Sequence, residues 1–117
     1  MTEKIKKGLE AEETAADYLE GRGFRILERN FRYRHCEVDL IVLKDNWLIF
    51  VEVKMRSSVA FGPPEIFVDR NKRHHVRKAS RHYIFNRNWT GNIRFDIIAI
   101  TKDSTSEEIL HIEDAFW

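Results

Sequence analysis

The chain has 117 residues, of which 43% are hydrophobic and 12% aromatic, and its formal net charge is +1. This apolar content excludes a disordered chain, and the length suits one domain, since single cores typically hold about 100 to 150 residues. No stretch reaches the ~20 apolar residues of a membrane span, the first residues lack a secretory segment, and one cysteine cannot form an intrachain disulfide. We therefore expect a single cytoplasmic domain over residues 1–117, without a membrane partner.

The first predicted element is a helix from about residue 3 to residue 20, which is rich in Ala, Glu, Lys and Leu and is stopped by Gly21 and Gly23. Glu12 lies at the centre of a stripe in which spacings of four and three residues alternate. The other members of this stripe are Ile5, Leu9, Ala16 and Leu19. An acid in an inward stripe is costly unless it is paired or coordinated, so Glu12 is either a site residue or the partner of an arginine such as Arg29.

Strands are predicted next. The first covers residues 24–31, and a hairpin follows with strands at 37–43 and 47–54. The residues between the last two strands, Lys44-Asp45-Asn46, favour a tight turn because Asp and Asn tolerate a positive φ. An irregular segment is predicted at residues 55–68, around Gly62-Pro63-Pro64.

A second helix is predicted from the cap residue Asp69 to about Phe85, and a strand covered on both faces is predicted at residues 93–101. The inward stripe of this helix comprises Val76, Ala79, Ser80, Tyr83 and Ile84. A short final strand is predicted at residues 109–112. This order predicts an α/β fold of the α+β type, in which helices pack on a small mixed sheet and the second helix connects two parallel strands.

The hairpin register follows from the alternation of its side chains. A two-residue turn pairs Asp39 with Glu52 and Glu37 with Lys54, which gathers the charges at one end of one face and leaves the other face aliphatic. Directly opposite residues have Cβ atoms about 5 Å apart, and two carboxylates that close repel by roughly 3 kcal/mol. A divalent cation offsets this repulsion, because Mg²⁺ binds through one or two carboxylates while it keeps several waters.

Lys54, beside these acids, is placed to orient or activate an attacking water and to stabilise charge on a phosphoryl oxygen. The alternative is an ordinary ion pair with one exposed acid on a solvated hairpin face. His35 and Cys36 are a second pair of metal-ligand type, but no further Cys or His stands at zinc spacing. Asp96, inside an apolar strand, is interpreted as a structural hydrogen-bond partner.

Acidic and basic residues are concentrated in different predicted elements. Residues 10–20 carry five acids and no Lys or Arg, whereas residues 70–87 carry seven cations and no acid. Cations on one helix can bind phosphates without reading sequence, and the alternative is a solvated helix face. The predicted nucleic-acid-binding residues are Lys72, Arg73 and Arg77 on this helix, with Arg56 and Ser57 after Lys54. His74, His75 and His82 are assigned to the solvated face of the same helix.

The motifs "EVDLI" (37–41), "FVEVKMRSS" (50–58) and "AFG" (60–62) resemble the bacterial YraN family of uncharacterised proteins. "AEETAADYL" (11–19), "KRHHVRKAS" (72–80) and "RFDIIAI" (94–100) extend the resemblance over nearly the whole chain. That family is assigned to the PD-(D/E)XK nuclease superfamily. The resemblance implies a restriction-endonuclease-like αβββαβ core and similarity to archaeal Holliday junction resolvases.

The resemblance also implies roles for single residues. Asp39 matches the metal-binding Asp of the superfamily, Glu52 and Lys54 match its E-x-K motif, and Glu12 matches the first-helix acid of the resolvases. Val38 stands where the superfamily motif has proline, and Cys36 stands where this family usually has glycine. Many members of the superfamily lack this proline, so the first departure costs little, and the second is expected to alter the local backbone. Ala11 and Met55 stand where Gly and Thr are expected in this family, and neither removes a ligand.

These observations together predict a Mg²⁺- or Mn²⁺-dependent endonuclease that hydrolyses phosphodiester bonds in DNA, with branched DNA as a candidate substrate. Asp39, Glu52 and Glu12 are the expected metal ligands, Lys54 serves the water or the transition state, and Glu37 is expected to hold Lys54. A homodimer is considered because a junction offers two cleavage sites. The alternatives are a nucleic-acid-binding module that does not cut, and an interaction domain of a DNA-processing complex.

Overall fold

The computed structural model describes residues 2–56 and 68–116. Within these ranges two helices and five strands follow in the predicted order, except that the last strand is longer than predicted. Their bounds are α1 (Glu3–Gly21), β1 (Arg25–Tyr33), β2 (Cys36–Lys44), β3 (Trp47–Arg56), α2 (Arg70–Arg87), β4 (Asn92–Lys102) and β5 (Glu107–Phe116). Most of the predicted irregular segment at 55–68 lies outside the described residues.

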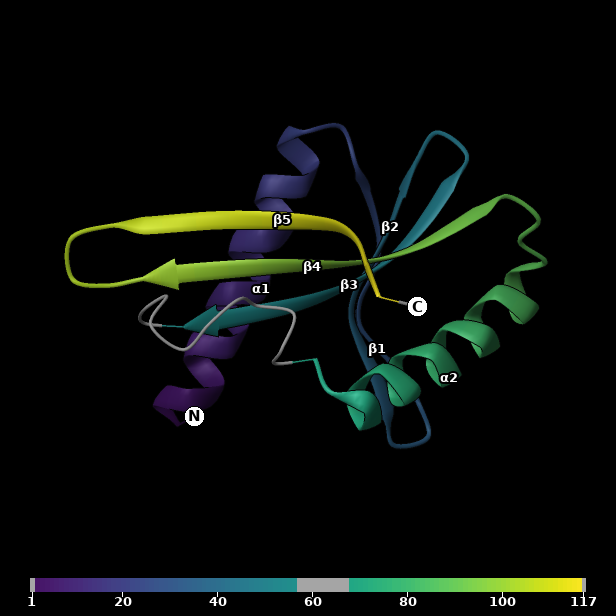
Figure 1. Ribbon diagram of the computed structural model, residues 1–117, viewed down its shortest axis with the longest axis horizontal. Helices are drawn as coiled ribbons and strands as arrows, with labels where there is room; N and C mark the ends of the chain where they lie inside the picture. The colour runs from purple at the N-terminus through teal and green to yellow at the C-terminus, as the bar shows by residue number, and fades with distance from the viewer. Residues whose placement is uncertain (1, 57–67, 117) are drawn as a thin grey trace.

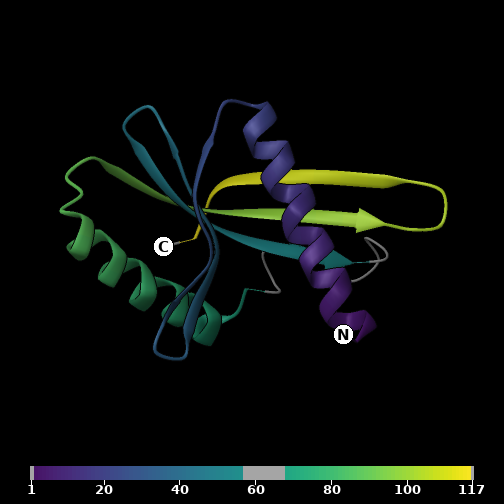
Figure 2. The same cartoon turned by 180° about the vertical axis from the view of Figure 1, so that it is seen from behind.

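The strands form one sheet in the order β1-β2-β3-β4-β5. β3 and β4, which α2 connects in the sequence, run parallel, and the other three neighbouring pairs are antiparallel. α1 crosses one face of this sheet and α2 lies on the other, beside β1 and β2 (Figures 1 and 2). This α+β architecture is the predicted mixed sheet, and it is compatible with a restriction-endonuclease-like core.

Local signals account for where the elements begin and end. The Asp69 carboxylate accepts a hydrogen bond from the Lys72 backbone at 2.8 Å, so the predicted cap of α2 is confirmed. α2 stops at Asn88, whose φ of 51° is left-handed and ends the helical hydrogen bonding. Asp45 has a φ of 54° in the turn between β2 and β3, as the hairpin signal requires. Neither described helix is both long and apolar enough to cross a membrane.

The sheet separates two apolar cores. In β3, Ile49 and Val51 pack toward α1, whereas Leu48 and Phe50 pack toward α2. Alternation along β3 therefore places Glu52 and Lys54 on the α2 side. They share this face with Leu48 and Phe50, as predicted. Val38 breaks the predicted aliphatic face of β2, because it joins the core on the α2 side.

The inward stripe of α1 differs from the prediction. Ile5 and Leu9 are 56% and 46% exposed, so the helix does not contact the sheet through its first turns. The buried residues are Ala11, Ala15, Ala16 and Leu19. Small alanines let the helix backbone approach the sheet closely, and the contact is therefore made by the C-terminal half of α1. Glu12, half-buried, lies at the edge of this contact.

Candidate functional site at the divergence of two strands

The two strands of the central hairpin diverge just before their charged residues. Their ladder confirms the predicted pairs Leu43 with Leu48 and Ile41 with Phe50, but it ends where Leu40 pairs with Val51. Beyond this point β2 continues beside β1 as far as Cys36, and β3 continues beside β4 as far as Arg56. Figure 1 shows β1 and β2 bending away from β3 and β4. The predicted direct pairs of Asp39 with Glu52 and of Glu37 with Lys54 are therefore wrong.

Asp39 bridges the divergence with its side chain. Its Oδ2 accepts a hydrogen bond from the Val53 backbone N–H at 2.8 Å, where the ladder between the strands has ended. Burial raises the pKa of Asp39, and this hydrogen bond opposes the rise. The carboxylate is therefore fixed to β3 next to Glu52, although the two residues are not ladder partners.

Glu52 is buried and poorly satisfied. Only 1% of its surface is exposed, and neither carboxylate oxygen has a hydrogen-bond partner among the described residues. The Lys72 ammonium lies 3.3 Å from Oε2 as an ion pair. Burial, followed by the charge of Asp39, raises the pKa of Glu52 to about 8 despite this ammonium. A buried carboxylate without hydrogen bonds costs free energy, which indicates that its position is kept for another reason.

Glu12 reaches the same group from the opposite face of the sheet. Burial and then the charge of Asp39 raise the pKa of Glu12, against a hydrogen bond with the side chain of Asn30. Arg29 binds Glu13 instead, at 2.6 Å, so the predicted alternative of a Glu12–Arg29 pair is wrong. Arg29 therefore does not neutralise the charge of Glu12.

Lys54 and Glu37 flank the site differently from the prediction. Lys54 is half-buried and close enough to Asp39 and Glu52 to lower the pKa of both. Glu37 binds Arg32 at 3.1 Å and does not hold Lys54. The physical reason is the register, because Arg32 on β1 is the ladder partner of Glu37 once β2 has left β3.

Lys72 has a contact that the sequence analysis does not predict. It is predicted as a nucleic-acid-binding residue of α2, and in the structure its ammonium pairs with Glu52. A signal for this position exists in the sequence. Lys72 precedes Val76 by four residues and therefore extends the inward stripe of α2 by one turn.

The other predicted nucleic-acid-binding residues are distributed around the site. Arg73 and Arg77 are half-buried on α2, and the Arg56 guanidinium donates to Thr101 Oγ1 at 3.3 Å. Ser57 lies outside the described residues. The prediction of solvated histidines holds for His74, which is exposed.

The prediction of a solvated position is wrong for the other two histidines of α2. His82 stacks on Tyr33 with ring centroids 3.9 Å apart, and His75 meets His35 edge-on at 5.4 Å. Both contacts exist because α2 packs against β1 and the turn that follows it, which residue counting along a helix cannot reveal.

Asp39, Glu52 and Glu12 offer donor atoms that suit a hard divalent cation. Carboxylate oxygens are the ligands of Mg²⁺ and Mn²⁺, and both Glu52 oxygens lack hydrogen bonds among the described residues. The three carboxylates do not form a preassembled cluster of ligand atoms within the described parts of the chain. Asp39 and Glu52 therefore suit direct coordination, whereas Glu12 suits a more distant position.

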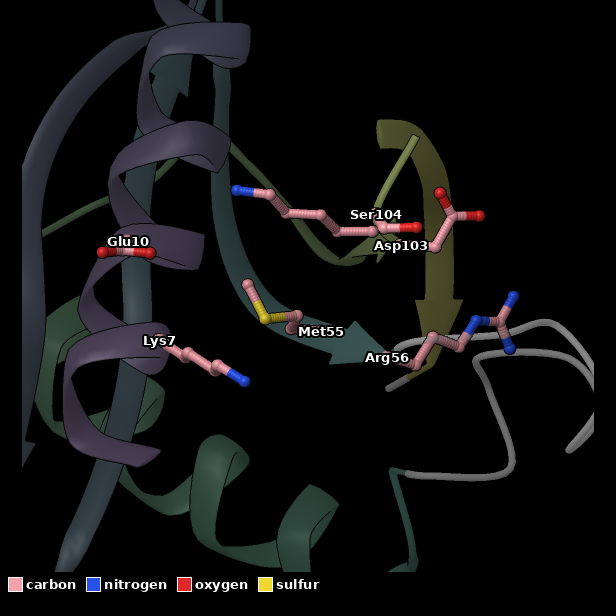
Figure 3. A pocket seen from close by; sticks show the side chains of 7 residues that line it. Lys7, Glu10, Met55, Arg56, Asp103 and Ser104 are labelled. Atoms are coloured by element: carbon pink, nitrogen blue, oxygen red, sulfur yellow. The ribbon is translucent and has the colours of Figure 1, made fainter. Parts of the chain in front are cut away.

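A cavity of about 450 Å³ lies near the end of β3 and is lined by none of the acids named above. It lies between α1 and the turn that joins β4 to β5 (Figure 3). Its lining residues are Lys7, Glu10, Met55, Arg56, Lys102, Asp103 and Ser104. Four of them are acids or cations besides Arg56, so side chains of both charges surround the cavity.

The mixed five-stranded sheet with a helix on each face is an α+β architecture that is compatible with a restriction-endonuclease-like core. The sequence pattern of the uncharacterised protein family UPF0102 matches residues 11–100. The chain belongs to this family, which is the YraN-like family that its motifs resemble.

Curated relatives are similar over nearly their whole length. A UPF0102 protein of Christiangramia forsetii is 42% identical over 117 residues, which cover 100% of this chain and 98% of the relative. A UPF0102 protein of Flavobacterium johnsoniae is 43% identical over 121 residues, with the same coverage. A UPF0102 protein of Trichlorobacter lovleyi is 48% identical over 109 residues, which cover 90% of this chain and 85% of the relative. These names state no activity, so the function must be argued from the site.

Proposed function

We propose that this protein is a Mg²⁺- or Mn²⁺-dependent endonuclease that hydrolyses phosphodiester bonds in DNA, with branched DNA as a candidate substrate. The observation that carries the proposal is the buried Glu52, whose two oxygens lack hydrogen bonds within the described chain and whose neighbour Asp39 is also acidic. Packing alone does not favour two such groups together, whereas a divalent cation stabilises both.

Asp39 and Glu52 would hold the cation. Bound there, it would supply Lewis-acid stabilisation of the charge that develops on a phosphoryl oxygen. Lys54, near both acids, would orient the attacking water and stabilise the same charge with its ammonium. The water oxygen then bonds to phosphorus while one P–O ester bond breaks, which leaves a phosphomonoester and a free hydroxyl.

Lys72 links this site to a surface for nucleic acid. It belongs to the first turns of α2, whose 18 residues carry seven cations and no acid. Arg70, Lys78, Arg81 and Arg87 on this helix are exposed. A phosphate backbone that follows α2 would therefore reach Lys72 and the acids beside it. If about four cations meet phosphates, affinity should fall about a hundredfold between 50 and 200 mM salt.

The test is cleavage of linear and four-way DNA with Mn²⁺, with Mg²⁺ and with chelator. Asp39→Asn, Glu52→Gln and Lys54→Met should each lose at least about a hundredfold in rate, because each removes an interaction made in the transition state. Glu12→Gln is tested as well, with Glu13→Gln as its matched control, since Glu13 lies on the same helix but binds Arg29. Cleavage that is equal in the wild type and all site variants would mean a contaminating nuclease and would refute the proposal.

A nucleic-acid-binding module that does not cut is the second candidate. It is favoured by the ion pair between Lys72 and Glu52, which satisfies part of the site's charge without a cation. It predicts salt-sensitive DNA binding that persists in Glu52→Gln, with no cleavage of any substrate by the wild type.

Light scattering of the protein with a four-way junction tests the homodimer expected for two cleavage sites.

A further inference from the structure

A second group of ligand-type side chains lies where the β1–β2 turn meets α2. His35 is in the turn, Cys36 is the first residue of β2, and His75 lies on α2 one turn beyond Lys72. One ring nitrogen from each histidine and the Cys36 sulfur all lie within 4.8 Å of one another. His75 is therefore brought close to two residues that stand about 40 positions earlier in the sequence.

The chemistry of this group differs from that of the carboxylates. Thiolate sulfur and imidazole nitrogen suit Zn²⁺ and similar transition metals, whereas Mg²⁺ prefers oxygen. Tetrahedral bonds of about 2.0 to 2.3 Å place ligand atoms roughly 3.4 to 3.8 Å apart. The group thus needs a contraction of about 1 Å, to which the exposed His35 can contribute by a change of rotamer.

Simpler roles explain the three residues less well. A buried cysteine can fill a core as a small hydrophobic residue, and two histidines can contact edge-on without any ligand. Packing does not require that both rings carry a nitrogen next to the same sulfur, however. A thiolate ligand would also offset part of the charge of a bound cation, which matters beside a helix with seven cations and no acid.

We propose that His35, Cys36 and His75 bind one transition-metal ion of the Zn²⁺ type. The described residues supply these three ligands, so a water or an added ligand would complete a tetrahedral site. Cys36 precedes Asp39 by three residues, and His75 follows Lys72 by three residues. An ion bound here therefore clamps β2 to α2 beside the carboxylate site and fixes the two elements that supply Asp39 and Lys72.

The test uses Co²⁺ as an optical probe and Zn²⁺ as a competitor, with the full chain in the Glu52→Gln background. This background weakens the carboxylate site, so the result does not depend on the proposed nuclease function. We expect one equivalent of Co²⁺ to give a thiolate charge-transfer band and tetrahedral visible bands, which Zn²⁺ abolishes and excess Mg²⁺ does not.

Cys36→Ser should remove the charge-transfer band, and His75→Asn should weaken Zn²⁺ affinity about tenfold or more. The matched control is His74→Asn, because His74 neighbours His75 on α2 but is exposed. His35→Asn changes an exposed residue and tests the site without disturbing the core, with circular dichroism as the check of folding. A Co²⁺ complex without the thiolate band would overturn the proposal. So would a Zn²⁺ affinity that neither His35→Asn nor His75→Asn weakens.

Discussion

Asp96 and Glu52 are buried carboxylates on neighbouring strands, yet their surroundings are opposite. Asp96 accepts hydrogen bonds from Arg94 at 2.8 and 2.9 Å, from the His111 ring at 2.7 Å and from the Asp114 backbone at 2.9 Å. Burial alone would raise the pKa of Asp96, but His111, Arg94 and Asp114 outweigh burial and lower it. Glu52 has no hydrogen bond within the described chain, and its pKa is raised.

This difference separates a structural acid from a candidate functional one. The Asp96 network joins β4 to β5 at the irregularity between Phe95 and Ile97, so its hydrogen bonds are used to hold the fold together. Glu52 contributes no such bond, and its burial costs free energy that the fold does not recover from hydrogen bonds. Satisfaction of hydrogen bonds, rather than burial, therefore distinguishes the two acids.

The largest expected effect compares the two acids by isosteric substitution. Asp96→Asn should lower the free energy of unfolding by about 3 kcal/mol, because it breaks a buried ion pair and leaves Arg94 with the longer, 3.6 Å pair to the exposed Glu113. Glu52→Gln should be neutral or stabilising at pH 8 without divalent cations, because it removes a buried charge whose cost the Lys72 ion pair at 3.3 Å offsets only in part. Urea denaturation of both variants measures the contrast. Equal destabilisation by the two substitutions would contradict the distinction.

The pH dependence of stability should differ in sign between the two acids. Glu52 has a folded pKa of about 8 and an ordinary value of 4.5. The cost of burying the ionised Glu52 is therefore absent below pH 4.5, and it lowers the free energy of unfolding by at most a few kcal/mol as the pH rises to 8. The difference in unfolding free energy between Glu52→Gln and the wild type, measured from pH 5 to pH 8.5, should increase with pH. A flat difference would show that Glu52 is not buried as an acid.

Asp96 should show the reverse dependence. Its folded pKa lies below its ordinary value of 3.8, so its contribution is fully present above that value and is lost as the pH falls through the folded pKa. Acid titration of stability below pH 4 should therefore be steeper in the wild type than in Asp96→Asn.

Divalent cations should stabilise the folded protein through the site of Glu52 and should have no effect through Asp96. At ten times its dissociation constant, Mn²⁺ should raise the unfolding free energy of the wild type by about 1.4 kcal/mol, because it binds only the folded form. Asp39→Asn and Glu52→Gln should lose this gain, and Glu13→Gln should keep it. A thermal shift with and without chelator gives the measurement, and an unchanged gain in Glu52→Gln would place the cation elsewhere.

The smallest expected effect concerns Lys72, which competes with a cation for Glu52. Lys72→Met should tighten Mn²⁺ binding several-fold, since the cation no longer displaces an ammonium 3.3 Å from the carboxylate. Lys78→Met, on the exposed face of the same helix, is the matched control and should change nothing. Weaker Mn²⁺ binding in Lys72→Met, measured by calorimetry, would instead make Lys72 a part of the cation site.

The sequence by itself determined the features that depend on neighbouring residues. Side-chain alternation placed Glu52 and Lys54 on one face of β3, a cap residue gave the start of α2, and turn chemistry gave the register near Leu43 and Leu48. Each of these follows from local geometry, because strands alternate with a period of two and helix ends need hydrogen-bond acceptors.

Only the tertiary structure decided which charges meet. β2 separates from β3 beyond Leu40 but stays paired with β1. Glu37 therefore pairs with Arg32, and the Asp39 side chain bridges the two diverging strands. The packing of α2 on the sheet then brings Lys72 to Glu52 and carries His75 to Cys36. These contacts join residues far apart in the sequence, and their geometry depends on how whole elements pack, which periodicity along one element does not specify.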